Sequence, residues 1–251
     1  MIRIVAMLAT IMLGYAAAAA ESVPSCDVPE SLIPADYELT HAAAAVKDNR
    51  RLQITVVGSG SSALSGPDGA RLAYPARVEE ALRARLPGHE ITVTTHIQPR
   101  ETTAEMAAGL HKILADDKPA LVIWQAGTVD ALHGVEPEEF RASLDQGLEA
   151  IAAAGADAIM MNMQYSPRTE SMLGVTAYAD VMRWVAEQRT VLLFDRLAIM
   201  RYWNEEGIFD LYAATKDYAM ARRVHECIGR ALASQIINGA HLDAENMQTK
   251  R

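Results

Sequence analysis

The chain has 251 residues, 50% of them hydrophobic, and carries a formal net charge of −9 at pH 7. A chain of this length forms one domain or one large α/β unit with a sizeable core. The acidic balance argues against nucleic acid and anionic membrane surfaces as partners, because both repel a negatively charged protein.

The first twenty residues have the pattern of a secretory signal peptide. A single positive charge, Arg3, precedes an apolar run from Ile4 to Ala20 that ends in small residues before Glu21. The pattern predicts cleavage near Ala20, a mature chain without a membrane anchor, and a periplasmic or secreted location. The alternative is a transmembrane anchor. It is disfavoured because the run is at the short end for a span.

Residues 21–50 are expected to form an arm that prolines interrupt and that contains a short helix near residues 41–46. The arm holds Cys26, and the other cysteine of the chain is Cys227. In an oxidising compartment the two thiols could pair and tie the arm to the C-terminal helix. The alternative, two unpaired thiols with Cys227 buried on its helix, stays open at this point.

From residue 51 onwards, short apolar segments alternate with amphipathic ones, which predicts buried strands between helices. Thr102-Thr-Ala-Glu105 is a capping box that begins one of these helices. Strands are expected at residues 54–57, 91–95, 121–125, 158–162 and 191–194. Helices are expected at residues 74–86, 102–116, 137–154, 176–189, 197–204 and 217–238.

This order of elements predicts a five-stranded parallel sheet with helices on both faces, a three-layer α/β/α sandwich. The domain spans residues 51–240 and leaves a C-terminal tail at 241–251. Sites in such sheets lie beyond the carboxyl ends of the strands. The loops at that edge are 58–66, 96–101, 126–134, 163–170 and 205–217.

The segment Gly58-Ser-Gly-Ser-Ser-Ala63 also fits the dinucleotide fingerprint G-x-G-x-x-A. Two features disfavour that interpretation. Gly66-Pro-Asp-Gly69 interrupts the helix that the fingerprint needs, and the second strand ends at Thr95-His96 where a ribose-binding acid belongs. No cofactor is therefore expected. No spacing of histidine, cysteine and acidic residues resembles a zinc site.

Several segments resemble the SGNH/GDSL hydrolases. Gly60-Ser-Ser-Ala-Leu-Ser-Gly66 resembles their first block, and Leu121-Val-Ile-Trp-Gln-Ala-Gly-Thr128 resembles their third. Residues 161–168 and 198–203 resemble segments of a secreted bacterial branch. The resemblance covers about residues 52–237. It implies a flavodoxin-like α/β/α sandwich that hydrolyses acyl or acetyl esters of lipids and carbohydrates with a serine nucleophile, without metal or cofactor.

The resemblance places the family's nucleophile on Ser62, with Ser61 where an aspartate is usual. The second-block glycine, whose amide helps to bind the oxyanion, falls at Pro99 or Arg100. The third-block asparagine, a side-chain oxyanion donor, falls on Val129. The resemblance also places Gly127 and Thr128, which precede Val129, in the cleft or oxyanion region, together with Ser61, Arg100 and Asp130.

The final D-x-x-H motif, which carries the acid and the general base, falls on Lys216 and Ala219 or, one residue later, on Asp217 and Met220. Neither alignment supplies a histidine. A serine hydroxyl without a base is a poor nucleophile, and the loss of oxyanion donors adds to the deficit. Ester hydrolysis by the family mechanism is therefore expected to be slow or absent.

Three functions follow as hypotheses. The first is a degenerate hydrolase that binds an ester, carbohydrate or lipid ligand, or an envelope protein, through the former catalytic site. The second is an active serine esterase in which Lys216, or a histidine whose place the sequence does not fix, serves Ser62 as base. There Arg100 supplies positive charge near the site, and Asp130 lies in the third loop. The third is a purely structural envelope protein.

Two histidines, His96 and His133, follow strands and could approach this edge. The tryptophans Trp124, Trp184 and Trp203 are expected to pack. Only a Trp203 that faces the site would offer a platform for a sugar ring.

Overall fold

The computed structural model describes residues 26–213 and 218–242. Its centre is a five-stranded, fully parallel sheet in the order β2-β1-β3-β4-β5. The chain order reverses between the neighbours β1 and β3, so the carboxyl ends of these two strands flank the switch point where such sheets bind ligands. The strands are β1 (Arg51–Gly58), β2 (Glu90–Ile97), β3 (Leu121–Gln125), β4 (Asp157–Met161) and β5 (Leu192–Phe194).

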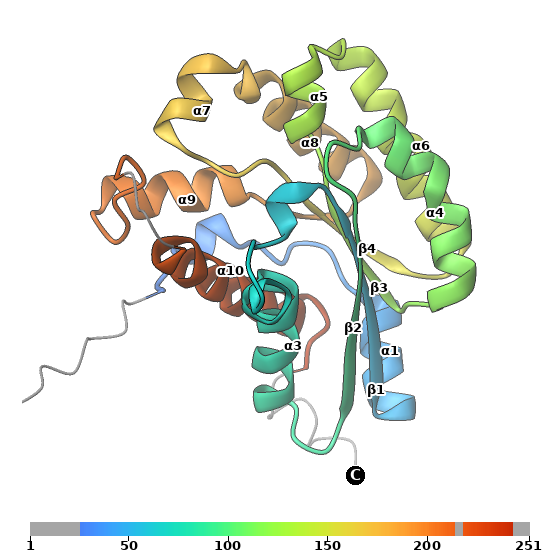
Figure 1. Cartoon of the computed structure of the whole chain (residues 1–251). Coiled ribbons are helices and arrows are strands. Elements are labelled where there is room, and N and C mark those ends of the chain that lie inside the picture. Colours follow the sequence, from blue (N-terminus) through green and yellow to red (C-terminus); the bar gives the residue numbers. More distant parts are fainter. Residues whose placement is uncertain (1–25, 214–217, 243–251) are drawn as a thin grey trace, which may run out of the picture.

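Helices cover both faces of the sheet, as predicted. In Figure 1, α3 (Tyr74–Arg85) and α10 (Ala219–Gly239) lie side by side on one face, and α9 (Arg196–Glu205) lies on the same side. The other face carries α4 (Thr103–Asp117), α6 (Pro137–Ala153) and α8 (Val175–Arg189). The three-layer α/β/α sandwich is thus confirmed.

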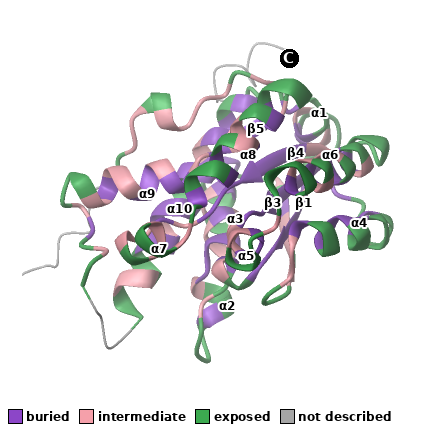
Figure 2. Ribbon diagram, turned by 90° about the horizontal axis from the view of Figure 1, so that it is seen from above, coloured by how far each residue is buried: buried purple, intermediate pink, exposed green. Residues whose placement is uncertain are grey.

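The strands at the centre are buried on both faces, which explains their uninterrupted apolar sequences. Figure 2 looks down on the carboxyl edge and shows the buried strands between helices whose outer surfaces are exposed. Every residue of β3 is buried, and Trp124 on this strand is 0% exposed. Trp203 is also 0% exposed, and its indole donates a hydrogen bond to the carbonyl of Asp27. The prediction of packing is confirmed for Trp124 and Trp203, and the idea of a sugar platform at Trp203 is wrong. For Trp184 the prediction is wrong, because this side chain is 48% exposed on α8 and lies beside the guanidinium of Arg141.

Local sequence signals account for several helix ends. The capping box before α4 is present: the Thr102 side chain accepts from the Glu105 amide, and the Glu105 carboxylate accepts from the Thr102 amide.

Three short helices were not predicted, because each occupies a segment expected to be a loop. They are α2 (Gly69–Leu72), α5 (Thr128–His133) and α7 (Pro167–Met172).

The segment predicted as an arm packs into the domain. It contains the short 3₁₀ helix η1 (Glu30–Leu32) and α1 (Thr40–Asn49), which buries Ala42 and Val46 completely. A disulfide joins Cys26 to Cys227 on α10 across 201 residues. The pairing that the sequence left open is therefore present, and it holds the segment against the closing helix.

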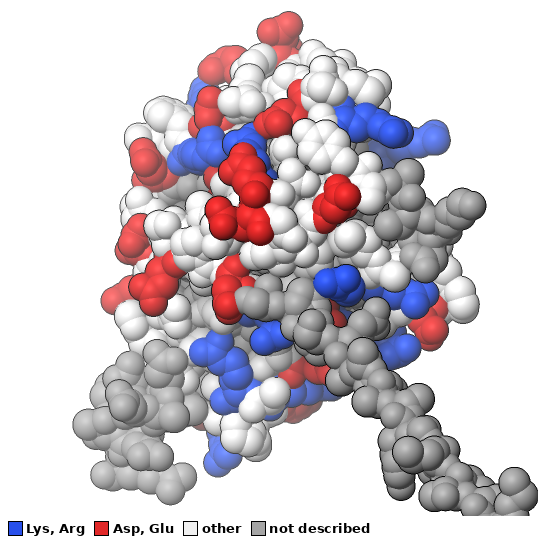
Figure 3. Space-filling model, turned by 90° about the vertical axis from the view of Figure 1, so that its left-hand side faces the viewer, with Lys and Arg blue, Asp and Glu red and all other residues white. Residues whose placement is uncertain are grey.

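Over the described ranges, none of the helices has both the length and the apolar character required to cross a membrane. Charge is unevenly spread over the face in Figure 3: most acidic side chains lie in its upper and middle parts, whereas lysine and arginine side chains lie both at the upper edge and in the lower part. The net charge of −9 describes the chain as a whole and does not describe each surface.

Candidate functional site

A cluster of serines lies where β1 ends. Ser59 follows the strand, and the chain then forms the 3₁₀ helix η2 (Gly60–Ser62). The neighbouring strand β3 ends at Gln125, and this side chain reaches across to the serines. We call Ser59, Ser61, Ser62 and Gln125 the serine cluster.

One oxygen is the common acceptor of the serine cluster. Oε1 of the fully buried Gln125 lies 3.0 Å from both the amide and the hydroxyl of Ser59, and 3.2 Å from the hydroxyls of Ser61 and Ser62. A side chain on Gly58 would place its Cβ 2.7 Å from Ser62 Oγ, so this close approach requires glycine. An amide oxygen offers two lone pairs. The cluster therefore contains more donors than its acceptor can fully satisfy.

The predicted nucleophile lies in the cluster but is sealed from solvent. Ser62 is 0% exposed, and its Oγ is 3.0 Å from the hydroxyl of Tyr74. Burial raises the pKa of Tyr74, so its hydroxyl keeps its proton and donates to Ser62. Ser61 is partly exposed. In this conformation a ligand would therefore meet the hydroxyl of Ser61 before that of Ser62.

A buried arginine lies behind Ser61. Arg196, the first residue of α9, is 1% exposed, and its guanidinium donates to the Ser61 carbonyl (3.2 Å) and to Ser61 Oγ (3.0 Å). Its Nε has no hydrogen-bond partner, and no carboxylate of the described chain pairs with it. Burial lowers its pKa to about 10, so the side chain remains charged at neutral pH. A buried charge without a counterion costs several kcal/mol in most proteins.

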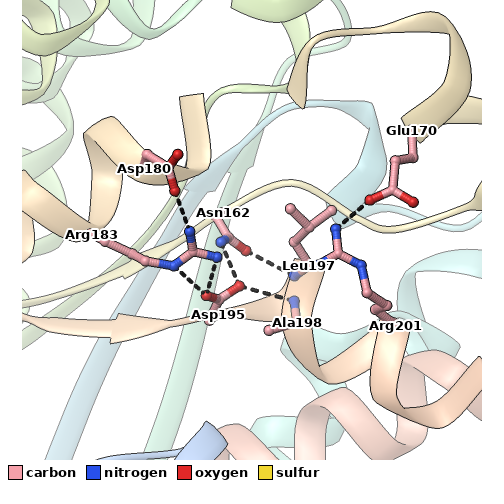
Figure 4. Close-up of polar contacts among 8 residues, drawn as sticks. All are labelled: Asn162, Glu170, Asp180, Arg183, Asp195, Leu197, Ala198 and Arg201. Atoms are coloured by element: carbon pink, nitrogen blue, oxygen red, sulfur yellow. Dashed lines mark hydrogen bonds and ion pairs between the residues drawn. The ribbon is translucent and has the colours of Figure 1, made fainter. Parts of the chain in front are cut away.

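A clamp of polar side chains fixes the start of α9 (Figure 4). Asn162, which follows β4, donates to Asp195 Oδ1 (2.7 Å) and accepts from the Leu197 amide (2.9 Å). Asp195 also accepts from the Ala198 amide, which caps the helix, and from the guanidinium of Arg183. Arg196 stands between two residues that this clamp holds, so its backbone position relative to the sheet is well determined. Nearby, Arg201 of α9 pairs with Glu170 of α7.

His225 is connected to the cluster through Tyr74, and its environment disqualifies it as a base. Its Nδ1 accepts a hydrogen bond of 3.0 Å from the Tyr74 amide, so the proton of the neutral ring sits on Nε2. Burial, with a smaller contribution from the charge of Arg196, lowers the pKa of His225 to about 3. The ring is therefore neutral at pH 7 and has no lone pair to offer a serine.

The pKa of His225 predicts a specific acid sensitivity. An unfolded histidine takes up a proton near pH 6.5, whereas the folded one resists until about pH 3. The unfolded state therefore binds more protons within this window. The contribution of His225 to the free energy of unfolding is complete above pH 6.5, and it decreases by about 1.4 kcal/mol for each unit by which the pH is lowered.

We expect the protein to lose about 2 kcal/mol more than a His225→Asn variant on going from pH 7 to pH 5. In that variant an amide oxygen replaces Nδ1. Urea unfolding of both proteins at the two pH values measures the difference. Equal losses would show that His225 does not couple folding to protons.

The other residues predicted for the site have structural partners or lie at its margin. Gly127 precedes α5 with φ of 92°, and Thr128 begins that helix beside the Gln125 amide. Asp130 is 1% exposed and accepts from both the amide and the hydroxyl of Thr103, which joins α5 to the start of α4. Arg100 is exposed with φ of 70° and makes no hydrogen bond or ion pair within the described ranges. Lys216 lies outside the described residues.

Two of the family positions predicted to be altered flank the cluster. Pro99 is the nearest residue to the position where a Cβ on Gly60 would stand, at 3.9 Å. Val129 is 6% exposed at the start of α5 and has no donor to give. His96 does not approach the cluster: its Nε2 pairs with Asp117, which also accepts from the Thr55 hydroxyl. His133 lies exposed at the end of α5.

Sequence reasoning missed Gln125, Tyr74, Arg196 and the clamp residues. A signal was available for three of them, since Gln125, Asn162 and Asp195 are polar residues at the carboxyl ends of buried strands. Arg196 had no such signal, because its burial depends on the packing of α9. In the described part of the chain, no group of three or more histidine, cysteine and acidic side chains is placed to hold a metal ion.

Comparison with known proteins gives a consistent picture. A model described as the non-GDSL lipase-like family matches residues 25–242. The chain is 28% identical to the esterase TesA of Pseudomonas aeruginosa over 140 residues, which cover 56% of this chain and 68% of that protein. It is 27% identical to an arylesterase of Vibrio mimicus over 120 residues, 48% of this chain and 58% of that one.

Solved structures share the fold. A catalytic mutant of Axe2, an acetylxylan esterase from Geobacillus stearothermophilus, superposes with a TM-score of 0.60 at 18% identity, over 74% of this chain and 94% of that one. The crystal structure of TesA gives 0.51 at 21% identity, over 74% and 95%. At these identities the likeness establishes the architecture alone.

Proposed function

The chain belongs to the non-GDSL lipase-like family, within the SGNH/GDSL hydrolases, and from that premise we propose that it is an exported ligand-binding protein whose ester hydrolysis is impaired or lost. The ligand, a small-molecule ester, carbohydrate or lipid, binds at the serine cluster. The proposed partners also include an envelope protein that binds to the same edge of the sheet.

The proposal rests mainly on one observation, that no histidine of the described residues is placed to act as a base for a cluster serine. Within the described ranges, no histidine nitrogen lies within hydrogen-bond distance of a cluster serine. The lone pair of His225 Nδ1 already accepts a hydrogen bond from the Tyr74 amide. A serine without a base reacts slowly, because its hydroxyl must lose a proton as it attacks.

The stabilisation of the oxyanion is weakened as well. Val129 supplies no side-chain donor at the position that the family resemblance assigns to an asparagine. Loss of one oxyanion donor typically lowers kcat by about 10²–10³-fold. In this proposal, the lack of a histidine base among the described residues and the lack of the side-chain donor at Val129 impair hydrolysis, while the edge still binds a ligand.

Export is supported by two independent features. Residues 1–20 have the pattern of a cleaved signal peptide, although they lie outside the described residues. The disulfide between Cys26 and Cys227 is typical of oxidising compartments such as the periplasm.

A second candidate function is an active serine esterase. The observation that favours it is the 3.0 Å contact between Ser61 Oγ and the charged guanidinium of Arg196, because a nearby positive charge stabilises an alkoxide. In this alternative Ser61, or Ser62 after a local rearrangement, attacks the ester. The base is then an unassigned group such as Lys216.

Hydrolysis of p-nitrophenyl acetate and butyrate by the mature protein tests the proposal. We expect the rates of the wild type, Ser61→Ala and Ser62→Ala to agree within about twofold, since neither hydroxyl has a histidine base in the described part of the chain. Ser65→Ala is the matched control, because Ser65 is an exposed serine of the same loop. A loss of about tenfold or more in either cluster variant, with folding intact by circular dichroism, would overturn the proposal and identify the nucleophile.

A further inference from the structure

The serine cluster has a surplus of hydrogen-bond donors. The amide of Ser59 and the hydroxyls of Ser59, Ser61 and Ser62 all lie within 3.2 Å of the single oxygen Oε1 of Gln125. Hydroxyls accept as well as donate, but Ser62 Oγ already accepts from Tyr74 and Ser61 Oγ from Arg196. A ligand that brings only acceptor atoms would satisfy this surplus.

The charge at the same place is also unbalanced. Arg196 is 1% exposed and, within the described ranges, its guanidinium makes hydrogen bonds only to Ser61. Its Nε has no partner. Other arginines near the start of α9 are treated differently: Arg183 pairs with Asp180 and Asp195, and Arg201 pairs with Glu170. Both neighbours therefore have counterions, whereas no carboxylate of residues 26–213 and 218–242 pairs with Arg196.

The clamp keeps this charge in place. Asp195 and Leu197 flank Arg196 and both bond to Asn162 at the end of β4. The buried backbone of Arg196 therefore has little freedom to move the guanidinium towards solvent. A ligand that carries a negative charge would therefore stabilise the guanidinium in its buried position.

Resting on the proposed function, we infer that the ligand carries a small carboxylate, which binds between the Ser61 hydroxyl and the guanidinium of Arg196. A carboxylate has only acceptor atoms and matches the planar fork of arginine. Ser61 is the partly exposed serine of the cluster, and its neighbour Gly60 is exposed, so the carboxylate enters there. Rotation of the Ser61 side chain moves Oγ aside, and the hydroxyl then donates to the bound oxygen.

Thermal unfolding of the mature protein in sodium acetate, propionate or butyrate tests the inference, with sodium chloride and sodium phosphate at equal ionic strength for comparison. A ligand that binds only the folded state raises the Tm with concentration. We expect the carboxylates to raise the Tm of the wild type. In Arg196→Gln, we expect an apparent Kd at least about tenfold weaker, because the charge is lost. Arg51→Gln makes the same chemical change at an exposed pair with Glu90 and should behave as the wild type.

Three results would overturn the inference: stabilisation by phosphate alone, equal effects of carboxylates and chloride, or an unchanged response in Arg196→Gln. Should that variant not fold, Arg196→Lys keeps the charge and is expected to retain carboxylate binding, which saturation-transfer NMR detects directly; no binding by a folded Arg196→Lys counts against the inference. The ester assay is read separately. A protein that binds carboxylates and also hydrolyses esters through a cluster serine would refute the proposed function and leave this inference standing.

Discussion

Asp195→Ala is expected to lower the free energy of unfolding by about 3 kcal/mol, whereas Asp180→Ala is expected to change it by less than about 0.5 kcal/mol. Both substitutions remove a carboxylate from the same arginine, Arg183. They differ in burial, since the side chain of Asp180 is 65% exposed and that of Asp195 is 16% exposed. Water can take over the hydrogen bonds that the carboxylate of Asp180 makes, but it has little access to those of Asp195.

The expected loss at Asp195 has three physical sources. The fully buried Asn162 loses the acceptor of its Nδ2, and an unsatisfied buried donor costs about 1–3 kcal/mol. Helix α9 loses its side-chain cap at Ala198, which is typically worth about 1 kcal/mol. The contribution from Arg183 is smaller, because that side chain is 41% exposed and water can solvate it.

Urea unfolding of the wild type and the two variants at pH 7 gives the comparison. Asp195→Asn is a useful third variant, because its amide oxygen can still accept from Ala198 and so separates the cap from the charge. Equal effects of Asp195→Ala and Asp180→Ala would mean that the clamp contributes nothing beyond a surface ion pair.

Replacement of both cysteines, Cys26→Ser with Cys227→Ser, is expected to lower the free energy of unfolding by about 2–4 kcal/mol. The bond spans 201 residues, so its removal releases a very long loop in the unfolded chain. The noncovalent contacts of the N-terminal segment remain, including those from Trp203 to Asp27 and from Gln235 to Pro34. The variant should therefore fold, with lower stability.

Unfolding in the presence and absence of dithiothreitol supplies the control. The reductant should bring the wild type to the stability of the double variant and leave the variant itself unchanged. If the oxidised wild type and the variant unfold at the same urea concentration, the bond has no net effect on stability.

The architecture was accessible from the sequence because it depends on local and periodic signals. The run Leu121–Gln125 is apolar without alternation, which is typical of a strand covered on both faces, and the structure buries all of it. The capping box predicted the start of a helix, because its hydrogen bonds involve only the four residues Thr102–Glu105. The short helix α5 was missed because its six residues carry too little periodicity to be distinguished from a loop.

The candidate site was only partly accessible, because its chemistry arises from contacts between distant segments. Spacing located the serines, but which hydroxyl faces solvent depends on Tyr74, twelve residues beyond Ser62 in sequence. The burial of Arg196 depends on tertiary packing, and its guanidinium contacts Ser61, which lies 135 residues away in sequence. Its sequence neighbours give no hint of that, so the buried cation had to be found in three dimensions.

The disulfide also changes the covalent topology of the molecule. Because Cys26 and Cys227 lie near the two ends of the described chain, their bond closes nearly the whole domain into a single covalent circle. A protease that nicks an exposed loop inside this circle, such as the one around Gly66 or the one after Met172, opens the circle but does not divide the molecule. A nicked molecule remains one particle, with its two segments tethered and able to refold together.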